Sequence, residues 1–187
     1  MIRIGMIGEY PSDTKAIANL LNKKYADVIE FFPLIRGVHG SNLDNQKIKH
    51  LLRKEYEIVK PDFVLFIRDL DGLEHHTEQI NYRKACFTDF NSVINKKGIL
   101  LLNIYELEAL LLTDFVVVSK YYGKEISHLE DCMLIESPKD FIKKNIRSYS
   151  TGHNPDLFAL LDYKIVIAKC RYFKKFDEDF EKIVSAN

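Results

Sequence analysis

The sequence contains no tryptophan and little glycine, proline or cysteine: 8, 5 and 3 residues out of 187. The low glycine and proline contents, together with the absence of a short repeat, exclude collagen-like and low-complexity chains. The sequence also lacks an excess of charge of either sign, because 27 basic residues balance 27 acidic ones. A neutral chain is not expected to coat nucleic acid non-specifically. It can still be an enzyme that acts on nucleic acid, because acidic metal ligands offset basic residues in the sum.

Cysteine usage and hydropathy indicate the compartment. Cys86, Cys132 and Cys170 are far apart and odd in number, so neither a disulfide framework nor a cysteine-based zinc site is expected. We interpret them as core residues in a reducing environment. The longest apolar stretch, residues 98–114, is interrupted by polar side chains and is not expected to span a bilayer. The N-terminus lacks the basic region and cleavage site of a signal peptide, so we expect a cytoplasmic protein.

Apolar runs and helical patterns alternate over the first two thirds of the chain. The run FVLFI at residues 63–67 has no polar alternation, which is typical of a central parallel strand buried on both faces. The pattern predicts an α/β fold, with a mostly parallel sheet flanked by helices over about residues 1–115 and a helical cover over residues 116–187. The length and a hydrophobic content of 47% predict a single domain. The expected strands are 2–7, 28–34, 63–67 and 99–104; the expected helices are about 12–24, 43–60, 78–96, 138–146, one from Pro155, and 173–184.

Acidic side chains directly follow three of the expected strands. In a parallel sheet the carboxyl ends of the strands meet at one edge, where open α/β proteins bind their ligands. Crowded carboxylates repel one another unless a cation neutralises them, and hard oxygen ligands favour Mg²⁺ or Mn²⁺. The pattern therefore predicts a divalent-metal site suited to phosphoryl or phosphodiester chemistry. Its candidate metal ligands are Glu9 and Asp13 after the first strand, Asp69 and Asp71 after the third, and Glu106 and Glu108 after the fourth.

These carboxylates also have structural interpretations. Asp and Glu are common at strand-to-helix turns as N-caps, and capping of the first helix accounts completely for Asp13. Strand alternation is expected to turn Asp69 and Asp71 to the same side, where both can hold one metal. Glu106 and Glu108 cannot both face the site if their segment is already helical, and Glu106, which is nearer the strand, is slightly preferred.

Three segments, IGEYPSD, FIRDLDG and NIYELEALLLTD, resemble the motifs of Toprim-type proteins, and the resemblance covers about residues 1–115. The third segment looks like that of small stand-alone bacterial Toprim-like proteins whose functions are largely unassigned. A broader relative is the Toprim nuclease domain of overcoming-lysogenization-defect nucleases. The resemblance implies a Toprim-like fold, Mg²⁺ or Mn²⁺ as the cofactor, and nuclease activity on DNA or RNA.

The resemblance also implies roles for individual residues. A basic residue toward the C-terminal side is used in the nuclease branch, a role that Lys139 or Lys169 could fill. Tyr10 departs from the pattern, because many Toprim domains have glycine there, and it puts topoisomerase- or primase-like activity in doubt. The implied assignments are Glu9 and Asp13 for the first acidic motif, Asp69 and Asp71 for the D-x-D metal ligands, Glu106 or Glu108 for the later acidic ligand, and Glu9, Asp69, Asp71 and Lys169 as catalytic candidates.

Several other features have two interpretations. Arg68 either contacts a phosphate or forms an ion pair with a neighbouring carboxylate. His75 and His76 follow on a loop and are more simply solvated than ligands. Residues 36–40 form a weak candidate phosphate loop without a Walker pattern. Residues 169–176 interleave basic and aromatic side chains, which suits either an amphipathic closing helix or stacking on nucleic acid.

Two principal functions follow. The first is a divalent-metal-dependent nuclease or related phosphodiesterase, with nucleic acid as its substrate and a defence or mobile-element context. The second is a non-catalytic interaction module that keeps the fold and acts with a protein partner. A phosphatase or nucleotide-binding protein that uses the same acidic edge is a third interpretation.

Overall fold

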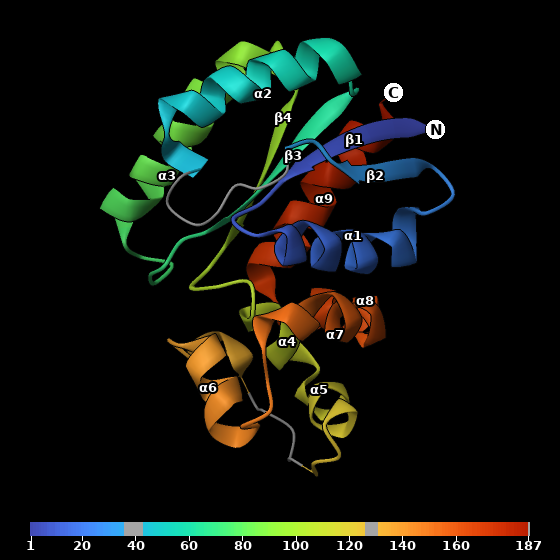
Figure 1. Ribbon diagram of the computed structural model, residues 1–187. Coiled ribbons are helices and arrows are strands. Elements are labelled where there is room, and N and C mark those ends of the chain that lie inside the picture. Colours follow the sequence, from blue (N-terminus) through green and yellow to red (C-terminus); the bar gives the residue numbers. More distant parts are fainter. Residues whose placement is uncertain (36–42, 126–130, 187) are drawn as a thin grey trace.

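The computed structural model describes residues 1–35, 43–125 and 131–186. It contains a four-stranded sheet in the order β2-β1-β3-β4, with every neighbouring pair parallel (Figure 1). The expected α/β class, with a parallel sheet flanked by helices and a helical C-terminal region, is confirmed. The candidate phosphate loop at residues 36–40 lies outside the described residues. The strands are β1 (Ile2–Ile7), β2 (Ile29–Pro33), β3 (Phe63–Asp69) and β4 (Gly98–Asn103).

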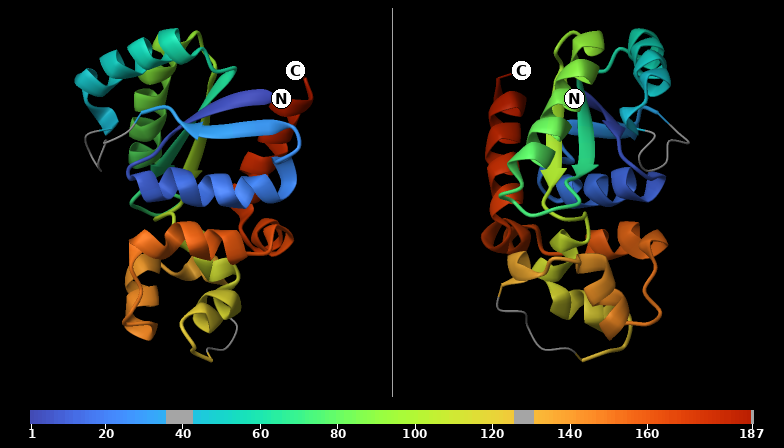
Figure 2. Two further views of the ribbon diagram at one scale, coloured as in Figure 1. Left: turned by 45° about the vertical axis from the view of Figure 1, so that its right-hand side comes forward. Right: turned by 90° about the vertical axis from the view of Figure 1, so that its left-hand side faces the viewer.

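Helices cover both faces of the sheet (Figures 1 and 2). Helices α2 and α3 pack on one face and α1 and α9 on the other, so the fold has three layers. The shorter helices α4 to α8 form a separate group beyond the end of the sheet (Figure 2). The helices are α1 (Pro11–Tyr25), α2 (Gln46–Val59), α3 (Thr77–Asn91), α4 (Ala109–Thr113), α5 (Phe115–Tyr121), α6 (Pro138–Asn145), α7 (Asn154–Leu160), α8 (Tyr163–Lys169) and α9 (Arg171–Ser185).

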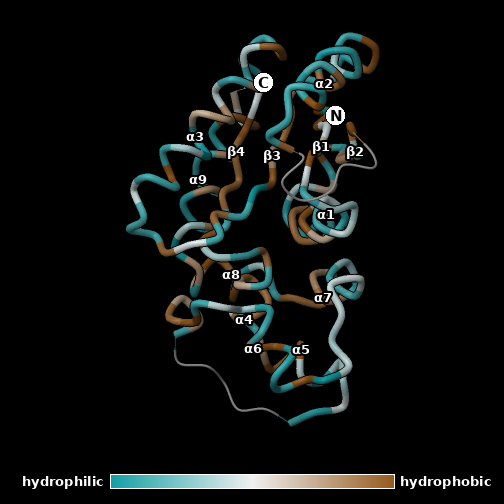
Figure 3. Tube along the Cα trace, turned by 60° about the vertical axis from the view of Figure 1, so that its left-hand side comes forward, coloured by the Kyte–Doolittle hydropathy of each residue, from teal (hydrophilic) through white to brown (hydrophobic). Residues whose placement is uncertain are grey.

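Strand β3 shows why its sequence is apolar throughout. Val64 and Phe66 lie in the core under α2 and α3, whereas Leu65 and Ile67 lie in the core under α1 and α9. Successive side chains of a strand point to opposite faces, so a strand covered on both faces needs apolar residues at every position. Figure 3 shows the strands as largely hydrophobic segments between more polar helices.

The winding of the chain creates a topological switch point at the carboxyl edge of the sheet. After β1 the chain passes through α1 on one face, and after β3 it passes through α3 on the opposite face. The two connections therefore diverge between the adjacent strands β1 and β3. Such a topological switch point is the usual ligand site of an open parallel sheet. The residues that follow β1 and β3 include the expected metal ligands.

Helix α9 closes the α1 face of the sheet. Phe173, Phe176 and Phe180 are buried, whereas Lys174 and Lys175 are exposed. The basic and aromatic tail therefore forms an amphipathic helix whose rings lie in the core. Its bases face solvent on the opposite side.

A buried carboxylate fixes α9 to the rest of the fold. Asp177 accepts hydrogen bonds from the hydroxyls of Tyr25, at 2.6 Å, and Tyr163, and from Lys24 Nζ at 2.9 Å. Burial alone would raise the pKa of Asp177, but these donors outweigh burial and hold it below the ordinary value. This network links α1, α8 and α9, and nothing in the local sequence pattern had marked it.

Two of the expectations about composition can be compared with the structure. Cys132 and Cys170 are buried, as expected for core residues, whereas Cys86 is only half-buried, and all three are free thiols. Within the described residues, no helix is long and apolar enough to cross a membrane.

Candidate functional site

The expected carboxylates gather at the carboxyl edge of the sheet, in two clusters on opposite faces. Adjacent residues of β3 cause the division, because Arg68 points to the α3 face and Asp69 to the α1 face. We call the first group, Asp13, Asp69 and Glu108, the α1-side cluster. We call the second group, Glu9, Asp44 and Asp71 with Arg68 and Arg83, the α3-side cluster.

Asp69 is the centre of the α1-side cluster. It is the last residue of β3 and pairs in register with Asn103, the last residue of β4. Asn103 Nδ2 donates a hydrogen bond to Asp69 Oδ1 at 3.0 Å. Burial raises the pKa of Asp69 well above its ordinary value, and the neighbouring carboxylates Glu9, Glu108 and Asp13 raise it further. Of the interactions that act on Asp69, the Asn103 hydrogen bond is the one that lowers its pKa.

Asp13 lies in the first turn of α1 and caps the helix from there, whereas it had been expected at the N-cap position. Tyr10 is the N-cap residue, Pro11 begins the helix, and Asp13 Oδ2 accepts the Tyr10 backbone N–H at 2.9 Å. Burial raises the pKa of Asp13 to about 7, with Glu108 and Glu9 adding to the effect. Asp13 thus has a structural role and also belongs electrostatically to the acidic edge.

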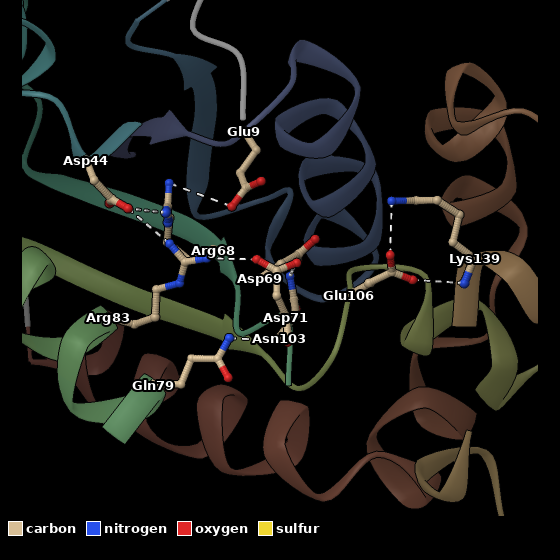
Figure 4. A network of polar contacts seen from close by, with 10 residues as sticks. All are labelled: Glu9, Asp44, Arg68, Asp69, Asp71, Gln79, Arg83, Asn103, Glu106 and Lys139. Carbon is tan, nitrogen blue, oxygen red and sulfur yellow. Dashed lines mark hydrogen bonds and ion pairs between the residues drawn. The ribbon is translucent and has the colours of Figure 1, made fainter. Parts of the chain in front are cut away.

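The structure favours Glu108 over Glu106 as a member of the α1-side cluster, whereas the sequence slightly favoured Glu106. Both precede α4 in a turn, but Glu108 is buried and interacts electrostatically with Asp13 and Asp69. Its Oε1 accepts hydrogen bonds from Tyr149 Oη at 3.0 Å and Asn154 Nδ2 at 3.1 Å. Glu106 instead points toward α6 (Figure 4). Tyr105, which precedes Glu106, has a left-handed backbone with φ of +59°, so the chain does not continue from β4 in extended form.

The two candidate lysines make different contacts. Lys139 Nζ is 3.2 Å from Glu106 Oε1, and its backbone N–H donates to Glu106 Oε2 at 3.0 Å (Figure 4). Burial lowers the pKa of Lys139, but Glu108, Glu106 and Asp69 outweigh burial and raise it. Lys169 Nζ donates to the Thr113 carbonyl at 2.9 Å. Lys139 is therefore held at the acidic edge by Glu106, and Lys169, which had been placed among the catalytic candidates, contacts the end of α4.

The α3-side cluster is a network of ion pairs (Figure 4). Asp44 Oδ2 accepts hydrogen bonds from Arg68 Nη2 and Arg83 Nη1, each at 3.0 Å. Arg83 Nη2 donates to Asp71 Oδ2 at 2.8 Å, and Arg68 Nη1 lies 3.7 Å from Glu9 Oε1. Of the two interpretations of Arg68, an ion pair with neighbouring carboxylates is what the structure contains. Burial raises the pKa of Glu9 above its ordinary value, and Arg68 opposes that rise.

The D-x-D pair does not behave as a continuous strand. β3 ends at Asp69, and Asp71 adopts a left-handed backbone with φ of +54°. Asp69 is therefore half-buried on the α1 side, whereas Asp71 is exposed and pairs with Arg83. The expectation that alternation turns both side chains the same way assumed an extended backbone, and the backbone leaves the extended region at Asp71.

The donor set suits a hard divalent cation. Carboxylate oxygens are joined by Asn103 Oδ1, a buried oxygen without a hydrogen-bond partner among the described residues. In the ranges 1–35, 43–125 and 131–186, however, no group of three or more His, Cys, Asp or Glu side chains is arranged to hold a metal ion. Glu9 and Asp71 would therefore have to turn from the arginines to Asp69 to bind one.

A mainly apolar cavity of about 360 Å³ lies beside the acidic edge, between α1 and β2. Its lining includes Gly8 and Tyr10, the chain neighbours of Glu9, together with Phe31 and Phe32. Tyr10 has an extended backbone, with φ of −138°, so the structure does not require glycine at the position where the Toprim pattern has it. The half-exposed ring of Tyr10 forms part of the cavity wall.

The loop histidines remain outside this arrangement. His75 and His76 are exposed, and the preceding Glu74 pairs with Arg171 at 3.5 Å. Their exposure fits the simpler interpretation, in which they are solvated.

Three site residues had not been identified from sequence: Asp44, Arg83 and Asn103. Asn103 carried a usable signal, since it is the one amide that ends an otherwise apolar strand. Asp44 and Arg83 gave none, because their ion pairs join segments 24 and 39 residues apart. No family model matches this chain, and no curated protein or solved structure was found that is similar to it.

Proposed function

We propose that this chain is a divalent-metal-dependent phosphodiesterase of the Toprim nuclease type, acting on nucleic acid. The observation that carries the proposal is the half-buried carboxylate of Asp69 at the switch point. It has Glu9, Asp13 and Glu108 as electrostatic neighbours and an unpaired Asn103 oxygen beside it. Such a group is costly without a counter-cation. The three motif segments that resemble Toprim proteins support the same proposal.

In this proposal Glu9, Asp69 and Asp71 hold Mg²⁺ or Mn²⁺, and Glu108 completes the acidic site from the buried side. When bound, the metal would activate water and neutralise charge on the phosphate. The protein's own residues would orient the phosphate and exclude bulk water. Lys139 provides a fixed positive charge at the same edge, held by Glu106.

The direct test is cleavage of single- and double-stranded DNA and RNA with Mn²⁺ or Mg²⁺, with and without chelator. We expect cleavage that needs the metal and falls at least a hundredfold in Asp69→Asn and Glu9→Gln. Glu178→Gln is the matched control, because Glu178 is exposed on α9, away from the acidic edge. Cleavage that persists in both chelator and Asp69→Asn would overturn the proposal.

A non-catalytic interaction module is the second candidate, favoured by the ion pairs that already neutralise Glu9 and Asp71. Thermal denaturation separates the two candidates. Binding to the native state stabilises a protein by about 2.7 kcal/mol at a hundred times the dissociation constant. We expect micromolar Mn²⁺ to raise the melting temperature of the wild type but not of Asp69→Asn. No shift below millimolar Mn²⁺ would favour the interaction module.

A further inference from the structure

We propose that Arg68 and Arg83 form a phosphate-binding subsite, which the carboxylates of Glu9 and Asp71 occupy while no phosphate is present. This inference deepens the proposed function, because it assigns the substrate phosphate to a place beside the acidic site. Arg68 lies at the carboxyl end of β3 and Arg83 lies on α3, and both have N–H donors that can bind a phosphate.

Neither guanidinium has all its donors paired. Arg68 is only 7% exposed, yet its Nη1 is buried without a hydrogen-bond partner among the described residues, since Glu9 Oε1 is 3.7 Å away. Arg83 Nε is likewise buried and unpartnered there. An unpaired buried N–H group costs about 1–3 kcal/mol. Two arginines that share one acceptor and each keep an unpaired donor are suited to an oxyanion with several acceptor oxygens.

Asp44 holds the two arginines side by side. Its Oδ2 accepts from both at 3.0 Å, and its side chain is only 17% exposed. Without this shared acceptor the two positive charges would repel each other. Asp44 thus presents a pair of planar donor groups to the switch point, the arrangement in which arginines bind phosphate in a bidentate way.

The remaining two carboxylates are held less firmly. The Asp71 side chain is 56% exposed, and exposed ion pairs contribute at most about 1 kcal/mol. The Glu9 contact exceeds hydrogen-bonding distance. Phosphate oxygens can therefore replace both groups on the arginines, while Asp44 stays in place.

Charge complementarity points the same way. The cluster's two arginines and three carboxylates leave one excess negative charge, which disfavours an anion. A divalent cation on Glu9, Asp69 and Asp71 would remove that excess, because it adds two positive charges to a group that then has four carboxylates. A phosphodiester would therefore meet a neutral cluster instead of a negative one. Cation and phosphate are therefore expected to bind cooperatively. The cation draws Glu9 and Asp71 away from the arginines, and the phosphate takes their place on the arginines, which leaves the two carboxylates free for the cation.

The test measures binding of inorganic phosphate by calorimetry, first in metal-free buffer. Asp71→Asn removes a competing carboxylate, so we expect it to bind phosphate at least fivefold more tightly than the wild type. Adding Arg83→Gln to Asp71→Asn should abolish that gain, whereas Arg83→Lys should retain part of it. Glu57→Gln is the control, because it also removes one exposed carboxylate from an arginine, Arg53. Equal phosphate affinity in Asp71→Asn and Glu57→Gln would overturn the subsite.

A second arm uses Mn²⁺, with binding as the readout. The wild type should bind phosphate at least fivefold more tightly with Mn²⁺ than without it, and Arg83→Gln should lose this gain while still binding Mn²⁺. If Mn²⁺ binds and Arg83→Gln changes nothing, the subsite is wrong and the metal site stands. If Mn²⁺ does not bind but Asp71→Asn gains phosphate affinity through Arg83, the metal site is wrong and the subsite stands. Comparing a dinucleotide with a nucleoside monophosphate shows whether a diester or a terminal phosphate is preferred.

Discussion

The α1-side and α3-side clusters contain the same kind of acidic side chain but balance its charge in different ways. In the α3-side cluster, Arg68 and Arg83 stand against Glu9, Asp44 and Asp71 at distances of 2.8–3.7 Å. In the α1-side cluster, Asp69 has an amide donor, and burial raises its pKa well above the ordinary value.

The difference lies in how much of the acidic charge at one sheet edge is neutralised by the protein's own arginines. A carboxylate neutralised by arginine is stable in the absence of ligand, whereas a buried carboxylate without a cation favours its protonated form. The α3-side cluster is thus a network of ion pairs, which a bound ligand would have to open. In the proposed function, the α1-side cluster is the part that a cation would complete. Glu9 connects them, because it touches Arg68 and also acts electrostatically on Asp69.

The largest expected effect comes from breaking the α3-side cluster. Arg68→Gln should lower the free energy of unfolding by on the order of 3 kcal/mol, because it leaves Glu9 and Asp44 buried with less positive charge. Urea denaturation at pH 7 measures this. Arg53→Gln is the matched control, since Arg53 forms an exposed pair with Glu57 at 3.0 Å and should cost less than about 0.5 kcal/mol. Equal losses in the two variants would contradict a structural role for the network.

A pH effect tests the α1-side cluster. The pKa of Asp13 rises from 3.8 to about 7 on folding, so the folded protein holds more protons than the unfolded chain in this range. The free energy of unfolding should therefore fall as the pH rises from about 4 to about 7 in metal-free buffer. Asp13→Asn should remove on the order of 2 kcal/mol of that decline. The full pKa difference corresponds to a larger free energy, but solvent partly reaches the side chain and screens its charge.

Asparagine at position 13 can still accept the Tyr10 N–H, so the cap survives the substitution. Asp27→Asn is the control, because Asp27 is an exposed carboxylate after α1. Its pH profile should match that of the wild type. If the free energy of unfolding falls equally with rising pH in Asp13→Asn and Asp27→Asn, the ionised Asp13 carboxylate does not destabilise the folded protein.

The smallest effect separates Glu108 from Glu106. Glu108→Gln keeps an acceptor for Tyr149 and Asn154 but removes the charge near Asp69, so we expect Mn²⁺ affinity to fall about tenfold, or about 1.4 kcal/mol. Glu106→Gln should change the affinity less than threefold, because that carboxylate is paired with Lys139. Calorimetric titration with Mn²⁺ decides the order. If Glu106→Gln weakens Mn²⁺ binding more than Glu108→Gln does, Glu106 and not Glu108 belongs to the metal site.

Much of the fold could be predicted, because its information is local. The apolar run at residues 63–67 and the apolar segments beside it predicted the parallel sheet, and topology alone brought Glu9 and Asp69 to one edge. The direction of individual side chains could not be predicted. Asp71 depends on a left-handed turn, and Glu108 depends on donors from Tyr149 and Asn154, 41 and 46 residues away.

The sequence by itself determined the layers of this protein and the concentration of acid at one sheet edge. Periodicity and strand-end position are properties of neighbouring residues, so they need no knowledge of distant partners. Only the tertiary structure decided which acids are neutralised and which are not. Asp44, Arg68 and Arg83 come from three separate segments, and their ion pairs exist only once α2, α3 and β3 are packed together. Charge balance is a long-range property, and in this molecule it distinguishes the structural cluster from the proposed metal site.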